Sequence, residues 1–379
     1  MRFGVAFFPV MGPEEKSAES YFDESLRLSV LADALGFEHV QIVEHHFTPY
    51  GGYSPDPVTF LAAVAARTRE IRVVTGAVVP AFVHPLKLAG KLAMLDNLSH
   101  GRLDAGFGRA FLPDEFAAFQ VPLSESRRRF AEGVEICRKL WSETEVSWHG
   151  DWVSFGPVTL LPRTVQRPHP PIFVAATTSP ESCAAAGRAG HHLQVVPTVT
   201  SREGLQEMLA AYREARRAAG HPGEGRIQLK YTCYLDEDRS RALERARRFE
   251  HNYIAKMTGA VAAWGGVRSD DYPGYEQLVE KVRRYDFEAS LAGNKVLAGT
   301  PAEVTEQIAT VREWFGAGLS VCLQFNPGCM PYEDAERAVR LFAAEVAPAF
   351  PATEIAAEAT PETNAETAAG TGAQQAVAR

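Results

Sequence analysis

Short apolar runs alternate with longer segments of helical periodicity along most of the chain. Eight of these runs predict β-strands: Arg2–Phe8, Phe37–Val43, Ile71–Val79, Arg102–Phe107, Pro171–Thr177, His191–Val196, Arg226–Cys233 and Ser320–Phe325. Several are apolar at nearly every position, which is typical of parallel strands that are covered on both faces. The segments between them predict helices over Tyr21–Leu35, Pro57–Thr68, Pro85–Leu98, Ser124–Trp141, Pro180–Ala189, Arg202–Ala219, Asp236–Met257 and Tyr332–Ala347.

Capping residues support these boundaries. Gly36 follows the first helix just before a strand, and Ser179 precedes Pro180 as an N-cap before a first-turn proline. Eight strands, each followed by a helix, predict an α/β protein with a closed (β/α)8 TIM barrel and insertions. The alternative is a doubly wound open sheet. That fold requires a glycine-rich dinucleotide turn after the first strand, and the residues at 11–14, Met-Gly-Pro-Glu, do not form one.

Two insertions and a tail complete the predicted organisation. Residues 1–350 form the barrel domain, and residues 144–170 predict a small hairpin over one mouth of the barrel. Residues 259–296 predict a lid or helical excursion, because long loops in compact domains tend to be functional. Residues 351–379 contain no aromatic residue and are dominated by Ala, Thr and Glu, so they predict a disordered tail.

Composition excludes several classes of protein. Lys and Arg number 39 against 47 Asp and Glu, and the net charge of −8 disfavours nucleic-acid and anionic-membrane binding. No run approaches the roughly 18–20 apolar residues of a membrane span. The five cysteines lack CxxC spacing, and the N-terminal apolar run is too short for a signal peptide. We therefore expect a cytoplasmic protein with reduced thiols.

The second strand ends in a cluster that could do chemistry. Glu44, His45, His46 and Phe47 follow one another at a strand end, where the active site of a barrel lies. Alternate residues of an extended chain face opposite sides, so one histidine can enter the mouth while the other packs behind it. A purely structural histidine pair is the alternative. A zinc site is disfavoured because no third ligand stands at a suitable spacing.

Three other strand ends carry candidate ligand-binding residues. Gly76 and Ala77 have no bulky side chain, so a flat ligand could lie against their backbone. Gly108 opens space beside Arg109, whose guanidinium suits a phosphate. The next strand ends in Ala176, Thr177, Thr178 and Ser179, hydroxyl groups that precede a helix N-terminus and favour an anion. Core packing, a salt bridge and helix capping are the respective structural alternatives.

These motifs together resemble the bacterial luciferase-like flavin monooxygenases. The resemblance rests on residues 44–48 (Glu-His-His-Phe-Thr), 75–85, 95–102 (LDNLSHGR), 106–109 (Gly-Phe-Gly-Arg) and 170–175, and it resumes at 299–303 and 342–348. It covers nearly the whole chain to about residue 350 and is weakest within 259–296. The His-His-Phe and LD-x-LS-x-GR motifs together are specific to this family.

The resemblance implies a barrel, commonly dimeric, that binds reduced FMN at the strand carboxyl ends. Reduced flavin and O2 would form a C4a-peroxyflavin that oxygenates a small organic substrate. His45 takes the position of the family's active-site histidine, where it could shuttle a proton. The resemblance assigns Arg109, Thr177, Thr178 and Ser179 to the FMN phosphate region. Glu44, Gly108 and Ala176 belong to the same predicted cofactor site, and no metal is predicted.

Other implications of the resemblance concern the partner and the alternatives. Gly76 and Ala77 match a stretch with a non-prolyl cis peptide beneath the isoalloxazine in relatives. Gly108 stands where the luciferase catalytic chain has a reactive cysteine, so light emission is not implied. No NAD(P)H motif is visible, so a separate flavin reductase is the expected source of reduced FMN, and a homodimer is expected. The alternatives are a deazaflavin-dependent oxidoreductase and a non-catalytic flavin-binding subunit.

Overall fold

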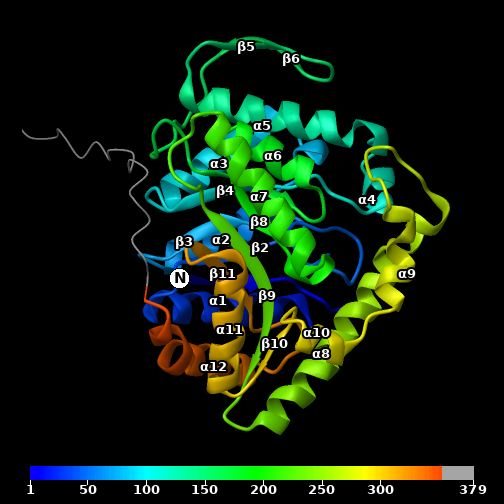
Figure 1. Ribbon diagram of the computed structural model, residues 1–379. Helices are drawn as coiled ribbons and strands as arrows, with labels where there is room; N and C mark the ends of the chain where they lie inside the picture. Colours follow the sequence, from blue (N-terminus) through cyan, green and yellow to red (C-terminus); the bar gives the residue numbers. More distant parts are fainter. Residues whose placement is uncertain (352–379) are drawn as a thin grey trace, which may run out of the picture.

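Eight parallel strands close into a barrel in the computed structural model, which describes residues 1–351 (Figure 1). Around the barrel the order is β1, β2, β3, β4, β7, β8, β9, β11 and back to β1. The bounds are β1 Arg2–Phe7, β2 His39–Ile42, β3 Arg72–Thr75, β4 Leu103–Phe107, β7 Ile172–Ala176, β8 His192–Val195, β9 Ile227–Leu235 and β11 Leu319–Gln324. The predicted (β/α)8 barrel is therefore confirmed.

Helices cover the outside of the barrel. They are α1 Ala18–Ala34, α2 Pro57–Arg67, α3 Pro85–Leu98, α4 Pro113–Ala118, α5 Ser126–Ser142, α6 Pro180–Arg188, α7 Arg202–Ala218, α8 Arg239–Ala260, α9 Leu278–Arg283, α10 Phe287–Ala292, α11 Pro301–Phe315 and α12 Tyr332–Leu341. Strands β2, β4, β8 and β11 are buried along their whole length, as expected for strands between helices and a filled interior. Their carboxyl ends all open on one mouth.

Ion pairs close the opposite, amino end of the barrel. The Asp104 carboxylate of β4 is fully buried and bonds Arg72 at 2.6 Å and Arg226 at 2.7 Å. The Glu38 carboxylate, just before β2, pairs with Arg2 at 2.6 Å. Each of these charges comes from the start of a different strand, so the network joins five strands of the barrel at one end.

Outside the two insertions, the structure adds one strand, β10, and two helices, α4 and α11, to the sequence predictions. The strand β10, Leu297–Gly299, pairs with the carboxyl half of β9, and α11 follows it directly. A capping box between Thr300 and Glu303 starts α11, with Pro301 in the first turn. These capping residues are a readable signal, and β10 was missed because three residues carry too little periodicity.

The first insertion forms the predicted hairpin in a different place. Strands β5 Val146–His149 and β6 Ser154–Val158 pair in antiparallel fashion. The Trp148 indole N–H donates to Glu132 of α5 at 2.9 Å, and Arg128 of α5 pairs with Asp151 at the turn. The hairpin therefore lies along the outer face of α5 (Figure 1), so the expectation that it covers a mouth is wrong. Its tryptophan packs on a helix instead.

The second insertion is the predicted helical excursion, and it lies against the carboxyl mouth. It includes α9 and α10 after the end of α8. The Trp264 indole donates to the Phe111 carbonyl at 2.9 Å, and the Tyr272 hydroxyl donates to the carbonyls of Arg109 and Ala110 at 3.0 and 2.7 Å. These bonds attach the insertion to the segment that follows β4.

Three further predictions concern the chain as a whole. All five cysteines are free thiols, as expected. Within residues 1–351, no helix combines the length and apolar character needed to cross a membrane. The predicted tail, 351–379, lies outside the described residues except for Pro351.

Candidate active site

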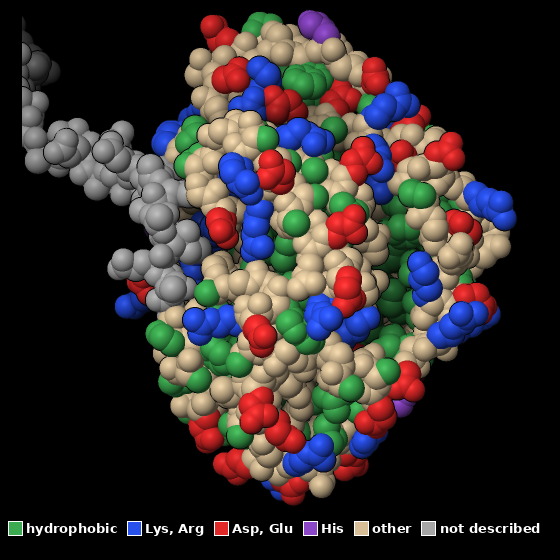
Figure 2. All heavy atoms as spheres, in the orientation of Figure 1, with side chains coloured by type: hydrophobic (Ala, Val, Ile, Leu, Met, Phe, Trp, Pro, Cys, Tyr) green, Lys and Arg blue, Asp and Glu red, His purple; other side chains and the backbone are tan. Residues whose placement is uncertain are grey.

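A cleft opens inside the barrel at the carboxyl ends of its strands. Residues of five strands and of the positions just after them line it: Gln41, Gly76, Ala175, Ala176, Thr177, Gln194, Val195, Val196, Gln228 and Lys230. On the outside, Figure 2 shows the surface hollowed between the barrel and the segment that carries α9, with hydrophobic side chains inside the hollow. This is the position at which barrel enzymes bind their ligands.

Two glutamines on the cleft wall have unused hydrogen-bonding atoms. The Gln194 side-chain amide donates to the Thr75 carbonyl at 3.1 Å and to the Gln228 side-chain oxygen at 3.2 Å. The Gln194 oxygen Oε1 and the Gln228 nitrogen Nε2 are buried without a hydrogen-bond partner. Buried polar atoms normally have partners, so such a free acceptor and donor favour a bound polar ligand.

Lys230 brings a cation to the same wall. Its ammonium lies 4.3 Å from the centroid of the Phe8 ring, and within residues 1–351 it forms no hydrogen bond or ion pair. Burial lowers the pKa of Lys230 to about 8, although the nearby Cys322 thiol opposes this shift. Neither Lys230 nor the glutamines were predicted from the sequence, because they stand inside strands rather than at strand ends.

Small residues stand at the strand ends beside the cleft, and Gly76, Ala175 and Ala176 line it. The Gly76–Ala77 peptide is cis, as the family resemblance predicts. A Cβ on Gly76 would lie 2.2 Å from Cγ of Gln41, so a larger side chain would displace this glutamine. A Cβ on Gly108 would meet the Ala77 Cβ at 3.2 Å and the Ala175 Cβ at 3.9 Å. The absence of a side chain at these two glycines lets neighbouring side chains approach the backbone closely, and Gly76 itself lines the cleft.

His45 lies in an aromatic cluster at the mouth. Its ring centroid is 5.4 Å from that of Phe8, 5.3 Å from Tyr50 and 5.8 Å from Phe111. The Nδ1 atom lies 3.1 Å from the Glu115 carboxylate of α4, which also accepts the His46 backbone N–H at 2.8 Å. His45 does not line the cleft directly; the Phe8 ring contacts both His45 and Lys230.

Glu44 and His46 point into a different environment. The His46 ring packs on Phe82 and Phe119, and its Nε2 lies 3.2 Å from the Glu44 carboxylate. The second Glu44 oxygen accepts the Val79 N–H at 3.0 Å. Burial raises the pKa of Glu44. The two histidine rings therefore lie in different aromatic clusters, and Glu44 holds the segment after β3 in place.

Arg109 presents a guanidinium without an acidic partner. Its Cζ lies 4.2 Å from the centroid of the Tyr272 ring, and its buried NH1 has no hydrogen-bond acceptor. Among the described residues no carboxylate forms an ion pair with it, so the salt bridge that was the structural alternative is absent there. A guanidinium with free N–H groups at a cleft is suited to an anionic oxygen.

The hydroxyl residues after β7 are partly free. Ser179 is the N-cap of α6, and its hydroxyl accepts the Ser182 N–H at 3.1 Å. The Thr177 hydroxyl lies 3.3 Å from the Tyr275 hydroxyl of the insertion, and Thr178 is exposed. Strands β4 and β7 are neighbours, with Phe107 beside Val174, so the loop that carries Arg109 and these hydroxyls follow adjacent strands. Helix capping accounts for Ser179 alone.

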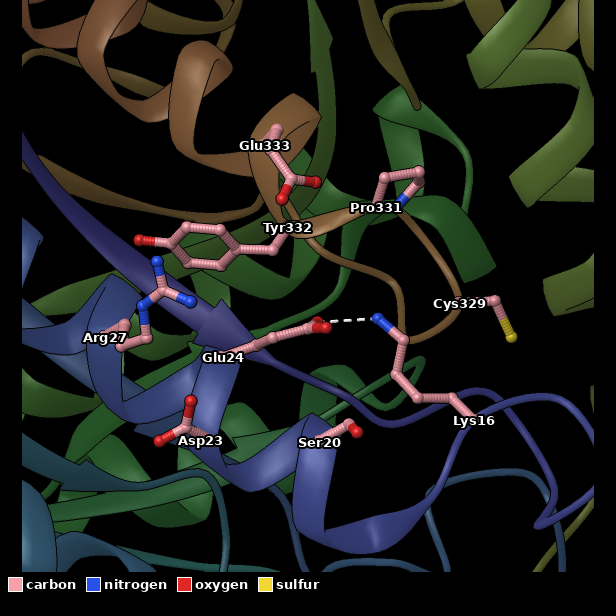
Figure 3. Close-up of a pocket in the computed structure, with 9 residues that line it drawn as sticks. All are labelled: Lys16, Ser20, Asp23, Glu24, Arg27, Cys329, Pro331, Tyr332 and Glu333. Atoms are coloured by element: carbon pink, nitrogen blue, oxygen red, sulfur yellow. Dashed lines mark hydrogen bonds and ion pairs between the residues drawn. The ribbon is translucent and has the colours of Figure 1, made fainter.

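A second cavity lies between α1 and the start of α12 (Figure 3). The Lys16 ammonium there bonds Glu24 at 2.6 Å and the Met330 carbonyl at 3.0 Å, and Arg27 stacks on the Tyr332 ring at 3.8 Å. Among the described residues, no buried polar side-chain atom of this lining lacks a hydrogen-bond partner, in contrast to Gln194 and Gln228 in the barrel cleft.

The fold and the cleft thus define a TIM-barrel protein with a polar ligand site at the carboxyl mouth, and the comparisons give its family. A sequence profile described as luciferase-like monooxygenase matches residues 1–318. The chain belongs to the luciferase-like monooxygenase family, and the resemblance inferred from its sequence is confirmed.

Solved and curated relatives agree with this membership. The crystal structure of the monooxygenase RslO1 from Streptomyces bottropensis is 52% identical, covers 92% of this chain and 99% of its own, and superimposes with a TM-score of 0.84. The oxygenase component of a flavin-dependent trigonelline monooxygenase from Acinetobacter baylyi is 30% identical over 57% of this chain and 59% of its own. An F420-dependent glucose-6-phosphate dehydrogenase from Amycolatopsis mediterranei is 27% identical over 88% and 96%.

The extent of these matches differs. The match spans 56% and 59% of the length of the first two curated relatives. Relatives named for a flavin and relatives named for F420 both occur in the family. The comparisons therefore show membership of the luciferase-like monooxygenase family and leave the activity, the flavin and the substrate to be inferred from the site.

Proposed function

We propose that this protein is a monooxygenase that uses reduced FMN and O2 to oxygenate a small organic substrate. The observation that carries the proposal is the Arg109 guanidinium, which has no acidic partner among the described residues and stands in the loop after β4, the strand that pairs with the β7 strand preceding Thr177 and the N-terminus of α6. Free N–H groups, hydroxyls and a helix N-terminus at adjacent strand ends suit a single phosphate group. The similarity to flavin monooxygenases supports the same assignment.

The remaining cleft residues fit the rest of an FMN molecule. The ring system would lie against Gly76 and Ala176, which line the cleft, with Ala77 and Gly108 next to them. Bound reduced FMN would supply the electrons that activate O2 for transfer of one oxygen atom to the substrate. Exclusion of water falls to the aromatic residues of the mouth, Phe111, Trp264, Tyr272 and Tyr275, which pack on one another.

His45 would move a proton in this reaction. The Glu115 carboxylate accepts a hydrogen bond from Nδ1 when that nitrogen is protonated, which leaves Nε2 as the basic atom of the neutral ring. The imidazole is thereby fixed in one tautomer and one orientation. Its place beside Phe8, Tyr50 and Phe111 puts this proton acceptor at the mouth rather than in the interior.

Two partners belong to the proposal. The A. baylyi relative is named as an oxygenase component, and a separate flavin reductase would likewise deliver reduced FMN to this protein. A second copy of the chain is the other partner. Met94 and Leu98 of α3 and the neighbouring Leu161 are 54%, 53% and 77% exposed, and this apolar patch supports a homodimer.

Oxygen consumption with photoreduced FMN tests the proposal. We expect reduced FMN to bind and O2 to be consumed in a substrate-dependent manner when candidate substrates are added. A His45→Ala variant should bind FMN as the wild type does and lose about 10²–10⁴-fold in oxygenation rate. If His45→Ala retains the full rate, the catalytic role of His45 is wrong.

The F420-dependent relative supports a second candidate, a deazaflavin-dependent oxidoreductase, because it aligns with 88% of this chain. Titration with F420 in parallel with FMN separates the two candidates. Binding of F420 with hydride transfer and without O2 consumption would replace the monooxygenase proposal.

A further inference from the structure

Three polar groups with spare hydrogen-bonding capacity line the inner wall of the cleft. They are the Gln194 oxygen, which is an acceptor, and the Gln228 nitrogen and Lys230 ammonium, which are donors. Gln194 and Gln228 are held in register by the pairing of β8 with β9 and by their mutual hydrogen bond. Lys230 follows two residues later on β9 and faces the same cleft.

The charge on Lys230 is unusual for this protein. Lys16, Lys91 and Lys256 each pair with a carboxylate at 2.6, 2.6 and 2.8 Å. Lys230 contacts the face of Phe8 instead and has no acidic partner in the described part of the chain. An ammonium kept in a cleft without a counter-charge is unfavourable for folding, so its presence there favours a role toward an anionic ligand.

A flavin offers two different edges to such a wall. The dimethylbenzene edge is apolar, whereas the pyrimidine edge has carbonyl oxygens, an N–H and the nitrogen N1. The wall supplies an acceptor for the N–H and donors for the carbonyls, so it complements the pyrimidine edge. Two-electron reduction with uptake of one proton at N5 leaves a negative charge on N1 and the adjacent carbonyl.

We propose that Lys230, with Gln194 and Gln228, binds the pyrimidine edge of the flavin and selects its anionic reduced form. This inference rests on the proposed function and names the residues that make the site bind reduced FMN more tightly than oxidised FMN. A cation beside N1 stabilises the reduced anion more than the neutral oxidised ring, because only the former carries the charge. If a reductase delivers reduced FMN, tighter binding of the reduced form lets the barrel take up reduced FMN and release oxidised FMN after the reaction.

The test compares Lys230→Met with Lys230→Arg in the full-length protein. Methionine keeps the length and apolar stem of the side chain and removes the charge, whereas arginine keeps the charge. Lys91→Met is the matched control, because it makes the same change in net charge on α3. The probes are oxidised FMN and anaerobically photoreduced FMN, with dissociation constants from fluorescence titration and the midpoint potential of bound FMN from dye equilibration.

We expect Lys230→Met to weaken binding of reduced FMN about tenfold and to leave binding of oxidised FMN within about threefold. A tenfold change in the ratio of the two constants corresponds to a fall of about 30 mV in the potential of the bound two-electron couple. Lys230→Arg and Lys91→Met should keep the wild-type ratio.

Two results would overturn the inference. Equal losses for both redox forms in Lys230→Met would mean that Lys230 contributes packing or a polar contact without redox selectivity, and no change in either would remove it from the flavin site. Failure of the proposed function is distinguishable, because the wild-type protein would then bind neither form of FMN.

Discussion

The two ends of the barrel differ in whether their buried charged side chains have a partner of opposite charge. At the amino end, the buried Asp104 carboxylate is shared between Arg72 and Arg226, and Glu38 pairs with Arg2. At the carboxyl end, Arg109 and Lys230 have no acidic partner within the described residues, and Gln194 and Gln228 have unused atoms. The charged groups of the amino end are paired with one another, although His39 Nε2 there has no hydrogen-bond partner, whereas the two cations of the carboxyl end have no counter-charge among the described residues.

This difference separates residues that stabilise the fold from residues that bind. A satisfied buried network contributes to the free energy of unfolding and offers nothing to a ligand. Unsatisfied groups lower stability and persist where function requires them. The cavity of Figure 3 is not a candidate site on this basis, because none of its lining residues has a buried polar side-chain atom without a hydrogen-bond partner.

The largest expected effect comes from breaking the amino-end network. Asp104→Asn leaves Arg72 and Arg226 without their shared counter-charge, so we expect the free energy of unfolding to fall by about 3 kcal/mol in urea titrations. Asp151→Asn, which removes an exposed ion pair with Arg128, should change it by less than about 1 kcal/mol. Similar losses of unfolding free energy for Asp104→Asn and Asp151→Asn would show that the buried network at the amino end contributes no more than an exposed ion pair.

The contribution of Asp104 should also depend on pH. Burial opposes ionisation of Asp104, but Arg226 and Arg72 outweigh it and hold the pKa well below its ordinary value of 3.8. The stabilisation is therefore complete above that value and declines as the pH falls below it. The difference in unfolding free energy between wild type and Asp104→Asn should shrink when urea titrations are repeated from about pH 5 toward pH 3. A difference that stays constant would rule out this linkage.

Removal of the unpaired guanidinium should affect binding alone. Arg109→Ala should weaken FMN binding by about 1.5–3 kcal/mol, the range for hydrogen bonds to charged groups. Riboflavin lacks the phosphate, so its affinity should be unchanged. Isothermal titration of both ligands measures the contrast, and equal losses for FMN and riboflavin would show that the phosphate assignment to Arg109 is wrong.

Glu115 offers a smaller and more specific test. Glu115→Gln keeps an amide oxygen for the His46 N–H and removes the charge beside His45 Nδ1. We expect kcat to fall about tenfold, through loss of the histidine's orientation, with the dissociation constant of reduced FMN unchanged. A raised dissociation constant with an unchanged kcat would place Glu115 in flavin binding instead.

The smallest expected effect is a gain of stability at the carboxyl end. Burial lowers the pKa of Lys230 to about 8 from an ordinary value of 10.5, so folding is penalised while the group is protonated. Lys230→Met should raise the free energy of unfolding of the ligand-free protein by about 1 kcal/mol. The gain should be full below about pH 8 and should fade as the pH rises toward 10.5. If Lys230→Met instead lowers the free energy of unfolding in urea titrations at pH 7, Lys230 stabilises the fold and the proposed difference between the two ends is wrong.

The predictable part of the fold lies in its periodic elements. All eight barrel strands were predicted within a few residues. Their apolar runs are bounded by residues that end or begin helices, such as Gly36 after the first helix and Pro180 in the first turn of another, and these signals act locally. The missed α11 carried a readable capping box at Thr300 and Glu303. The position of the β5–β6 hairpin was predicted wrongly, since no local pattern states that Trp148 bonds Glu132 on a preceding helix.

The candidate site also has a part that the sequence predicts, the residues at the strand ends, and a part that it does not, the partners of those residues. Strand-end positions alone indicated His45, Gly76, Arg109 and Thr177, because in a parallel barrel every carboxyl end reaches the same mouth. Their partners are distant in sequence: Glu115 stands 70 residues from His45, and Tyr272 stands 163 residues from Arg109. Sequence spacing gives no information about such contacts.

The sequence by itself determined the family, the alternation of strands and helices, and the residue types at the strand ends. Only the tertiary structure decided which charges are paired. Arg72 begins β3 and Arg109 follows the end of β4, and the side chain of Arg72 pairs with Asp104 whereas that of Arg109 meets no carboxylate among the described residues. Pairing depends on distances across the closed barrel, and those distances exist only after strands far apart in the chain have packed together.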